Sequence, residues 1–444
     1  MKKHILYILL IASCFFAQGQ EMLTLSDAID ITLKNNYDIR IAQLDTVVSN
    51  NNATAGNAGL LPSIYAEGSY NYASNNTDLE LLQINPDGSQ GIAPLSIDGA
   101  VTETLTGAVN IEYTIFDGFG GFHRLDRLKS LDGLTQLQTE NLVENVILNT
   151  IVLYLNAATQ QANVGINESQ LTISKERLQR AESDFKFGAT NRTSVLRAQV
   201  DVKNDSVTLR QTQLNYKAAR TQLNAYMGRA PETVFQVNEE VTFFPLVARE
   251  ELVATLKENN TVLQLSRQGL SVAEYDLKAL KSEQAPKVFL NGGYSYLDQQ
   301  NDAGQVLALT QDGWNVGVGL RLNIFDGNRT RRNIQNAKIA LEQSELEIAK
   351  TELDILTQFT NIYDEYEQAQ KDLDIEKSNL ETFRQSFDRS QLDFRNGQIS
   401  STDLRTAQLD LSNAQFRIVR STYTLKQKEA ELLTITGMLL NQNN

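Results

Sequence analysis

The chain has 444 residues, of which 41% are hydrophobic and 21% charged, and its formal net charge is −14. An acidic chain repels phosphate backbones, so nucleic acid is not an expected partner. The sequence holds one cysteine, Cys14, and two histidines, His4 and His123. If residues 1–19 are cleaved, as argued next, the mature chain keeps only His123, which excludes disulfides, thiol chemistry and zinc sites built from Cys and His.

The first residues, 1–19, predict a secretory signal peptide. MKKH supplies a charged start, ILYILLIA an apolar core and AQG at 17–19 a cleavage site, so the mature chain is expected to begin at Gln20. A second interpretation remains open, because IASC at 11–14 resembles a lipoprotein cleavage box that would make Cys14 an acylated first residue. Both interpretations describe an exported chain. No later apolar run approaches the roughly 20 residues that a helical bilayer span requires.

Alternating apolar and polar residues predict two strands in the first half of the chain, over about 63–73 and 104–116, and two in the second half, over about 287–297 and 313–325. Strands of about ten residues, apolar on one face and polar on the other, are typical of a transmembrane barrel wall. A soluble sheet covered by helices is the alternative. The residues between the first two strands, 75–99, contain a Pro-Asp-Gly turn signal and predict a long loop.

The tetrapeptide IFDG occurs twice, at 115–118 and 324–327, each time between a predicted strand and a very long polar stretch. Its aspartates, Asp117 and Asp326, can cap the helix that follows, and its glycines permit the turn. IFDG is therefore expected to join the strands to the helices.

Two long helical hairpins are predicted, over about 121–228 and 328–437, because no proline occurs between 95 and 230 or after 286. Apolar residues recur every seven positions on both sides of Gly188 and of Gly397, which is typical of antiparallel helices packed as coiled coils. The glycines are expected to end the first helices, and Thr193-Ser194 and Thr402-Asp403 to cap the return helices.

The chain is a tandem duplication. FKFGATNRTSVLRAQVD (185–201) matches FRNGQISSTDLRTAQLD (394–410) at a shift of 209 positions, whereas upstream of the strands the shift is 224. Repeat 1 therefore carries 15 more residues, the difference between 224 and 209, between its two strands. The expected organisation is listed here in chain order: signal peptide 1–19, repeat 1 at 20–228, linker 229–246, repeat 2 at 247–437 and tail 438–444.

This doubled order of helix, two strands, long helix and return helix resembles the outer-membrane efflux protein (TolC) family. F-x-x-G at the hairpin turn and G-x-L/M at the end carry the resemblance. LTLSDAIDITLKNNYDI resembles the family's N-terminal helix, and VNEEVTFFPLVAREELVATLKENN resembles its inter-repeat linker. The resemblance covers essentially the whole mature chain.

The resemblance implies an α+β membrane protein, mostly helical, in which a homotrimer forms a 12-stranded β-barrel continued by a periplasmic α-helical coiled-coil barrel. Such a protein is an outer-membrane channel, the exit duct of a multidrug efflux or type I secretion system. It is opened by a periplasmic adaptor (membrane fusion) protein and an inner-membrane transporter, and it needs no cofactor or metal. Independently, four strands cannot close a pore, since single-chain barrels need at least eight.

The two hairpin tips, 188–194 and 397–403, are rich in small and polar residues and are expected to dock the adaptor. The candidate docking residues are Gly188, Thr190, Asn191, Gly397, Ser400 and Ser401. In the family, acidic residues constrict the tunnel mouth. Asp403 falls on the first of two such positions and is the gate candidate, whereas the second falls on Thr406. Helix capping is the other role open to Asp403.

Two other function classes share parts of this pattern. A periplasmic coiled-coil adaptor, or a structural protein without a membrane barrel, would have the heptads but not the four alternating strands. An enzyme would need a convergent polar site, whereas Asp, Glu and Lys here lie on repetitive helical faces. No enzyme activity is expected.

Overall fold

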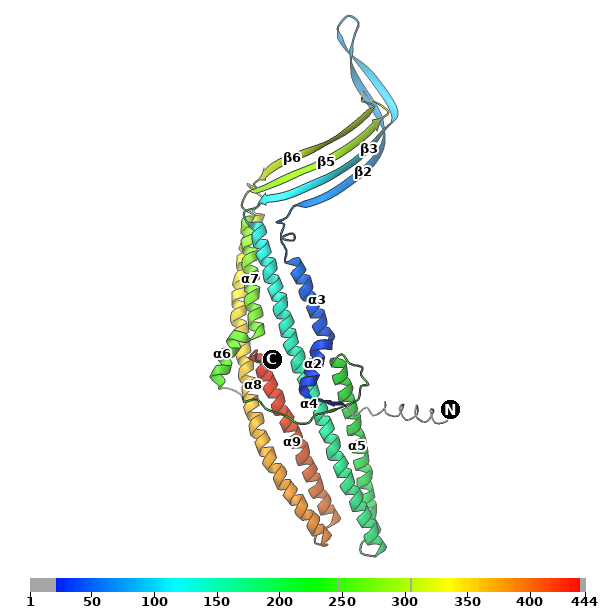
Figure 1. The fold of residues 1–444 in the computed structure, drawn as a ribbon, viewed down its shortest axis with the longest axis vertical. Helices are drawn as coiled ribbons and strands as arrows, with labels where there is room; N and C mark the ends of the chain where they lie inside the picture. The colour runs from blue at the N-terminus through cyan, green and yellow to red at the C-terminus, as the bar shows by residue number, and fades with distance from the viewer. Residues whose placement is uncertain (1–20, 246–247, 304–305, 440–444) are drawn as a thin grey trace, which may run out of the picture. The chain divides into compact units, whose positions relative to one another are not determined.

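The structure is a computed structural model and describes residues 21–245, 248–303 and 306–439. The predicted signal peptide, with Cys14, lies outside the described residues, as does most of the expected tail. The fold is α+β and mostly helical. It divides into two compact units, and each takes segments from both repeats (Figure 1). The first unit holds residues up to Val47, Thr135–Arg267 and the chain from Glu347; the second holds Val48–Leu134 and Gln268–Leu346.

The second unit contains a four-stranded antiparallel sheet in the order β2-β3-β5-β6. Its strands are β2 (Ser63–Ile84), β3 (Gln90–Phe116), β5 (Lys287–Asn301) and β6 (Ala308–Arg321). Within the described residues β2 and β6 each pair on one side only. The sheet therefore has two unpaired edges, one contributed by each repeat.

The first hairpin is longer than the sequence predicts. Residues 75–99 were expected to form a loop, but β2 and β3 continue to pair, with one register shift, as far as Ile84 opposite Gln90. The turn is short: Asn85 N–H donates to the Ser89 carbonyl at 2.8 Å, and Gly88 has φ +85°. The 15 additional residues thus extend a β-hairpin. The expected bounds 63–73 and 104–116 are too short for this reason. The bounds 287–297 are too short because β5 continues to pair with β3 as far as Asn301, and the bounds 313–325 are displaced because β6 runs from Ala308 to Arg321.

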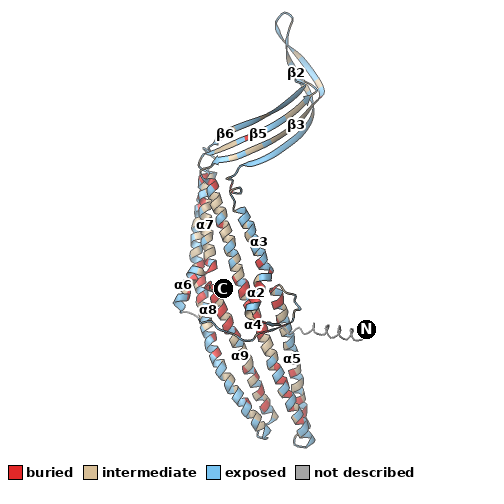
Figure 2. Ribbon diagram, in the orientation of Figure 1, coloured by how far each residue is buried: buried red, intermediate tan, exposed pale blue. Residues whose placement is uncertain are grey.

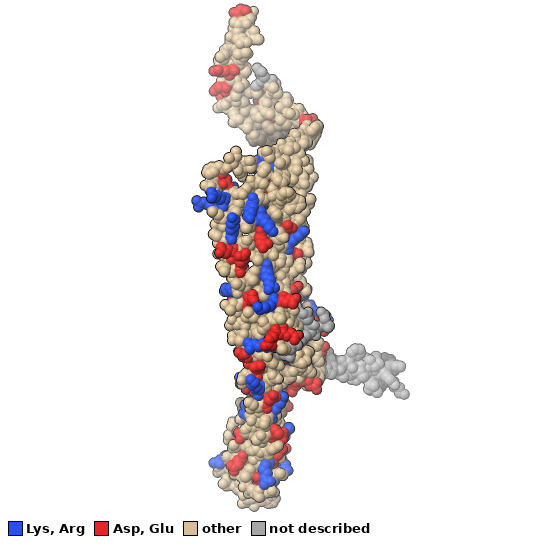
Figure 3. All heavy atoms as spheres, turned by 90° about the vertical axis from the view of Figure 1, so that its left-hand side faces the viewer, with Lys and Arg blue, Asp and Glu red and all other residues tan. Residues whose placement is uncertain are grey.

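Apolar side chains share one face of this sheet. The register places Tyr113, Leu290 and Val318 in one row and Val109, Tyr294 and Trp314 in another. On β6, Trp314, Val316, Val318 and Leu320 are 66–79% exposed (Figure 2). Within 63–116 there is no Lys or Arg, and the part of the sheet drawn in Figure 3 shows acidic but almost no basic side chains. Within the residues that the structure describes, this apolar face is left exposed to solvent.

The helices repeat with the lengths that a gapless duplication requires. α4 (Gly120–Lys186) and α8 (Arg329–Arg395) have 67 residues each, and α5 (Arg192–Tyr226) and α9 (Ser401–Ile435) have 35 each. The first and last residues of α8 and α9 follow those of α4 and α5 by 209 positions. The remaining helices are α2 (Leu25–Asn35), α3 (Tyr37–Asn52), α6 (Arg249–Asn259) and α7 (Thr261–Ser282).

The two IFDG segments turn the chain as expected, but their aspartates differ. Gly118 and Gly327 have φ +71° and +72°. Asp326 accepts from the Thr330 N–H of the first turn of α8 at 3.0 Å, which is a capping contact. Asp117 instead binds the Arg124 guanidinium at 2.9 Å. Both glycines therefore turn the chain, whereas of the two aspartates only Asp326 caps the helix that follows.

A large hydrophobic cluster forms the core of the first unit. It joins α2, α4, α5 and α9 to a short parallel strand pair, β1 (Glu21–Leu23) and β4 (Phe235–Val237), which the sequence did not predict. α4 supplies Ile147, Ile151 and Leu155 to this cluster. By length and composition alone, α4 is the one described helix that passes as a membrane span, which the sequence analysis missed. Half of that apolar stretch is buried, and we attribute its apolarity to core packing.

Candidate functional site

The first hairpin tip is a tightly bonded turn. Gly188 has φ +72°, and the N–H groups of Gly188 and Ala189 donate to the carbonyls of Phe185 and Asp184, which closes α4 in a Schellman motif. Asn191 caps α5, because its side chain accepts from the Ser194 N–H at 3.0 Å. The expected caps at Thr193-Ser194 are therefore wrong, because they lie two and three residues after the observed cap. Thr190 is half-buried, and Gly188 and Asn191 are exposed.

The second tip has the same backbone and a different cap. Gly397 has φ +75° and closes α8 as Gly188 closes α4. Ser400 caps α9, and its side chain and N–H exchange hydrogen bonds with Asp403 in a capping box. The expected cap at Thr402-Asp403 is wrong, because Asp403 occupies the third helical position. Hydrogen bonds from the Ser400 side chain, and then from its backbone, lower the pKa of Asp403, which is fully exposed.

Ser401 differs from the other predicted docking residues because a side chain of another helix binds it. Arg177 of α4 donates to the Ser401 carbonyl at 3.0 Å and to its hydroxyl at 3.2 Å. Arg180, one turn along, donates to the Arg395 carbonyl at 3.1 Å. The second tip is thus held against α4. Asp403, Ser400 and Gly397 remain exposed.

A buried polar cluster, which sequence reasoning missed, lies where α9 packs on α4 and α5. We call it the α9 polar cluster, and its members are Gln170, Ser174 and Arg177 of α4, Asp201 and Asp205 of α5, and Arg405 and Gln408 of α9. Asp205 and Ser174 fall three residues after Val202 and Leu171, at the second core position of each heptad. Polar residues at those positions were the available signal.

The charges within the α9 polar cluster compensate one another. Asp205 is 4% exposed and accepts from Arg405, Ser174 and Gln170. Burial acts to raise the pKa of Asp205, but these hydrogen bonds and the charge of Arg405 outweigh it, so the pKa is lowered. Gln408, 1% exposed, donates to the Gln170 carbonyl at 2.9 Å. Breaking the contact between Arg405 and Asp205, or the one between Gln408 and the Gln170 carbonyl, would leave a buried polar group unpaired. The cluster therefore fixes α9 in place.

The contacts of the α9 polar cluster and of the two hairpin tips hold the helices together and position them. The exposed turns at 188–191 and 397–400 offer backbone and small polar groups to a partner, and Asp403 offers a carboxylate beside the second turn.

The family profile described as outer membrane efflux protein matches residues 28–229 and 252–438. The chain is 21% identical to the outer membrane efflux protein BepC of Brucella suis biovar 1 over 77% of its own length and 69% of that protein. It is 24% identical to nodulation protein T of Rhizobium leguminosarum bv. viciae, but it spans about half (50%) of that protein's length. The fold matches the CmeC outer membrane channel of Campylobacter jejuni with a TM-score of 0.75 and 16% identity, over 94% of this chain and 86% of that one.

Proposed function

The chain belongs to the outer membrane efflux protein family, and on that premise we propose that it is the outer-membrane exit duct of a tripartite efflux or type I secretion system. Its strands cross the outer membrane in contact with lipid, and its long helices form a tunnel in the periplasm. It acts as a passive conduit for cargo delivered by an inner-membrane transporter.

One observation carries this proposal most directly: the β2-β3-β5-β6 sheet has an exposed apolar face and two unpaired edges. The rows Tyr113–Leu290–Val318 and Val109–Tyr294–Trp314 are apolar across neighbouring strands, as a lipid-facing wall requires. Unpaired edges expose backbone N–H and carbonyl groups, which have no partner in hydrocarbon. Both features are satisfied when sheets join edge to edge into a closed barrel.

Four strands per chain make a homotrimer the assembly that we propose. A single chain falls short of the eight strands of the smallest barrels, whereas three chains supply twelve. Edge strand β6 of one protomer would pair with edge strand β2 of the next. The three sets of helices would then surround one tunnel.

Opening by a partner is the proposed role of the hairpin tips. Gly188, Thr190 and Asn191, together with Gly397 and Ser400, would meet a periplasmic adaptor, and three copies of Asp403 would line the tunnel mouth. A ring of carboxylates favours cations. The contact between Arg177 and Ser401 supports a resting position for the second tip that docking must change.

Three measurements test the proposal together. Membrane fractionation should place the protein in the outer membrane, native mass measurement in detergent should give a trimer, and planar-bilayer recording should show conductance. Recovery from the soluble periplasm, or a stable monomer in detergent, would contradict it.

A further inference from the structure

A pocket of about 570 Å³ lies in the first unit, where helices of both repeats meet. Its lining residues come from α4, from the start of α7, and from α8 and α9. Pockets that hold drug-sized molecules have volumes of roughly 300–1,000 Å³. Five of its lining side chains are aliphatic: Leu148, Val262, Ile355, Ile362 and Ile435. The pocket is therefore large enough and apolar enough to hold an organic molecule.

The charged residues of this pocket are all acidic. Glu144 of α4, Asp354 of α8 and Glu431 of α9 line it, and none of its fifteen lining residues is Lys, Arg or His. The duplicated helices do not require these charges. At the shift of 209 residues the three acids correspond, in the same order, to the uncharged Leu353, Asn145 and Gln222. The acidity therefore belongs to this pocket and not to the repeated framework.

Glu144 is the buried acid among the three. It is 4% exposed, and it accepts a hydrogen bond from the Thr261 hydroxyl of α7. Burial raises the pKa of Glu144, the hydrogen bond from Thr261 acts against burial, and the charge of Glu140 adds to the rise. No positive charge contributes. A buried carboxylate without a positive partner is unfavourable, and either a proton or a bound cation relieves it.

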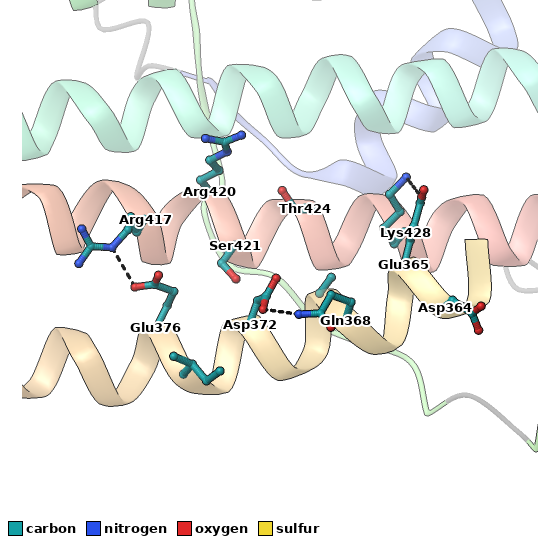
Figure 4. A pocket seen from close by; sticks show the side chains of 12 residues that line it. Asp364, Glu365, Gln368, Asp372, Glu376, Arg417, Arg420, Ser421, Thr424 and Lys428 are labelled. Carbon is teal, nitrogen blue, oxygen red and sulfur yellow. Dashed lines mark hydrogen bonds and ion pairs between the residues drawn. The ribbon is translucent and has the colours of Figure 1, made fainter. Parts of the chain in front are cut away.

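Two lysines pair with the other acids of the pocket. Lys428 of α9 is shared between Glu431 at 2.8 Å and Glu365 at 2.7 Å, and Figure 4 shows the second pair in the groove between α8 and α9. Lys350 lies 3.9 Å from Asp354, and both side chains are about two-thirds exposed, so water screens this pair. Neither lysine is therefore available to neutralise the buried acid of α4.

We infer that this pocket binds an organic cation, a protonated amine whose ammonium group pairs with Glu144 and whose apolar part lies against the aliphatic side chains. The inference goes beyond the proposed function, because a passive conduit needs no binding site of its own. A hydrated metal ion would gain nothing from the aliphatic wall, and among the described residues no group of three or more Asp, Glu, His or Cys side chains could hold one. An amine with a hydrocarbon body matches both the charge and the apolar surface.

Calorimetric titration of the purified full-length protein in detergent tests the inference. The probe is phenylbutylamine, and its control is phenylbutanol, which has nearly the same shape and no charge. The amine should bind saturably, one molecule per chain, and about tenfold more tightly than the alcohol or better, because a hydrogen bond between opposite charges is stronger than a neutral one. Magnesium chloride at the concentration of the amine should not displace it.

Glu144→Gln should abolish the preference for the amine. The glutamine amide oxygen can still accept from the Thr261 hydroxyl, so the pocket should keep its shape. Affinity for the amine should fall about tenfold or more, to that of the alcohol, whereas affinity for the alcohol should not change. The matched control is Glu168→Gln, the same change at an exposed position of α4 outside the pocket, which should bind the amine as the wild type does.

The pH dependence of the wild type gives a readout that needs no variant. A proton and the ammonium group compete for the Glu144 carboxylate, so amine binding is strong above the raised pKa of Glu144 and is lost as the pH falls through it. The other charged groups here are Glu140 on α4, Asp354 on α8, and Glu431 with Lys428 on α9, and α7 lines the pocket with none. They remain in Glu144→Gln, which should lack this loss of binding between about pH 8 and 4.

Four results would overturn the inference: equal affinities for the amine and the alcohol, an unchanged preference in Glu144→Gln, displacement of the amine by magnesium, or no saturable binding of the amine by the folded protein at about pH 8. None of these results bears on membrane fractionation, native mass or conductance, so the proposed function would still stand. A protein found in the soluble periplasm that binds the amine as expected would contradict the proposed function and leave this inference intact.

Discussion

Arg405 of α9 and Asp205 of α5, 200 residues apart in sequence, form a two-pronged ion pair: Nη2 lies 2.7 Å from Oδ1 and Nη1 lies 2.8 Å from Oδ2. The side chains are 15% and 4% exposed, so both charges are largely removed from water. The pair links the return helices of the two repeats.

Asp205→Ala should strongly destabilise the helical unit, because it leaves the Arg405 guanidinium and the Ser174 hydroxyl facing an emptied, buried site. Losing one partner of a buried pair costs about 3–5 kcal/mol, and thermal unfolding in detergent measures it. The control is Lys350→Ala, which removes an exposed pair with Glu347, 66% and 59% exposed, and should cost about 1 kcal/mol or less. Equal losses in the two variants would show that the cluster does not hold α9.

Two glycines with the same backbone conformation should respond very differently to substitution. Gly228 and Gly188 have φ +69° and +72°, so alanine is strained at both by roughly 1–2 kcal/mol. At Gly228 an added Cβ would lie 2.5 Å from the Asn35 carbonyl oxygen, whereas at Gly188 nothing lies within 4 Å. Gly228→Ala should therefore lower the melting temperature clearly more than Gly188→Ala. Similar decreases in melting temperature would mean that the end of α2, where Asn35 lies, moves easily to make room for the added Cβ.

Tyr423 should make the protein sensitive to alkali. Burial, and then the negative charge of Glu239, raise the pKa of Tyr423 to about 12. An unfolded tyrosine titrates near pH 10, so this contribution is complete below about pH 10 and is lost as the pH rises towards 12. Melting temperatures between pH 9 and 12 should fall less steeply in Tyr423→Phe than in the wild type. Tyr37→Phe, with a side chain 65% exposed, should keep the wild-type slope.

The sheet face can be tested with two arginines three residues apart. Val318 is 69% exposed and stands in the apolar row with Leu290, whereas Asn315 points to the other face of β6. Val318→Arg should insert poorly, because a midplane arginine on the lipid face costs about 2–4 kcal/mol, and Asn315→Arg should be tolerated. The amount of heat-modifiable trimer in the outer membrane is the readout. If both variants insert equally, the assigned faces are wrong.

Asp403 offers a test that separates a gate from a cap. If three Asp403 carboxylates line the tunnel mouth, Asp403→Asn should reduce cation preference in planar-bilayer conductance while the trimer assembles normally. Asparagine can still accept the Ser400 N–H, so the cap should be largely kept. Gly397→Pro, by contrast, should disrupt the turn that closes α8, because proline cannot adopt φ +75° and has no N–H to donate to the Phe394 carbonyl, and should thereby impair adaptor docking and efflux. Unchanged selectivity in an assembled Asp403→Asn trimer would leave this residue a capping group only.

Local sequence signals located most of the secondary structure and set several of its ends. Gly188 and Gly397 have the positive φ expected of helix-ending residues, and the heptads on both sides of them lie in α4, α5, α8 and α9. The N-caps were misplaced because Asn191 and Ser400 accept from the N–H three residues later, which moves each cap into the turn. The seven-residue spacing of apolar residues does not show which residue of the turn is the N-cap.

What the sequence did not reveal depends on pairing between distant segments. The long β2–β3 hairpin is held by backbone pairing, which continues through polar residues that break the alternation. Arg405 meets Asp205 only because α9 packs on α5, and no local pattern links the two. The parallel pair of β1 and β4, three residues each, is too short for any periodic signal.

The equal lengths of the paired helices restrict how this gene can change. Adding one residue to a helix rotates every later residue of that helix by about 100° about its axis. A single insertion in α4 would therefore turn its packing face away from both α5 and α9. Compensation would need a matching insertion in each neighbour. The β2–β3 hairpin carries no such constraint, and it is where repeat 1 already exceeds repeat 2 by 15 residues. Insertions and deletions among variants of this chain should therefore collect between Asn75 and Gly99 and be nearly absent from α4, α5, α8 and α9.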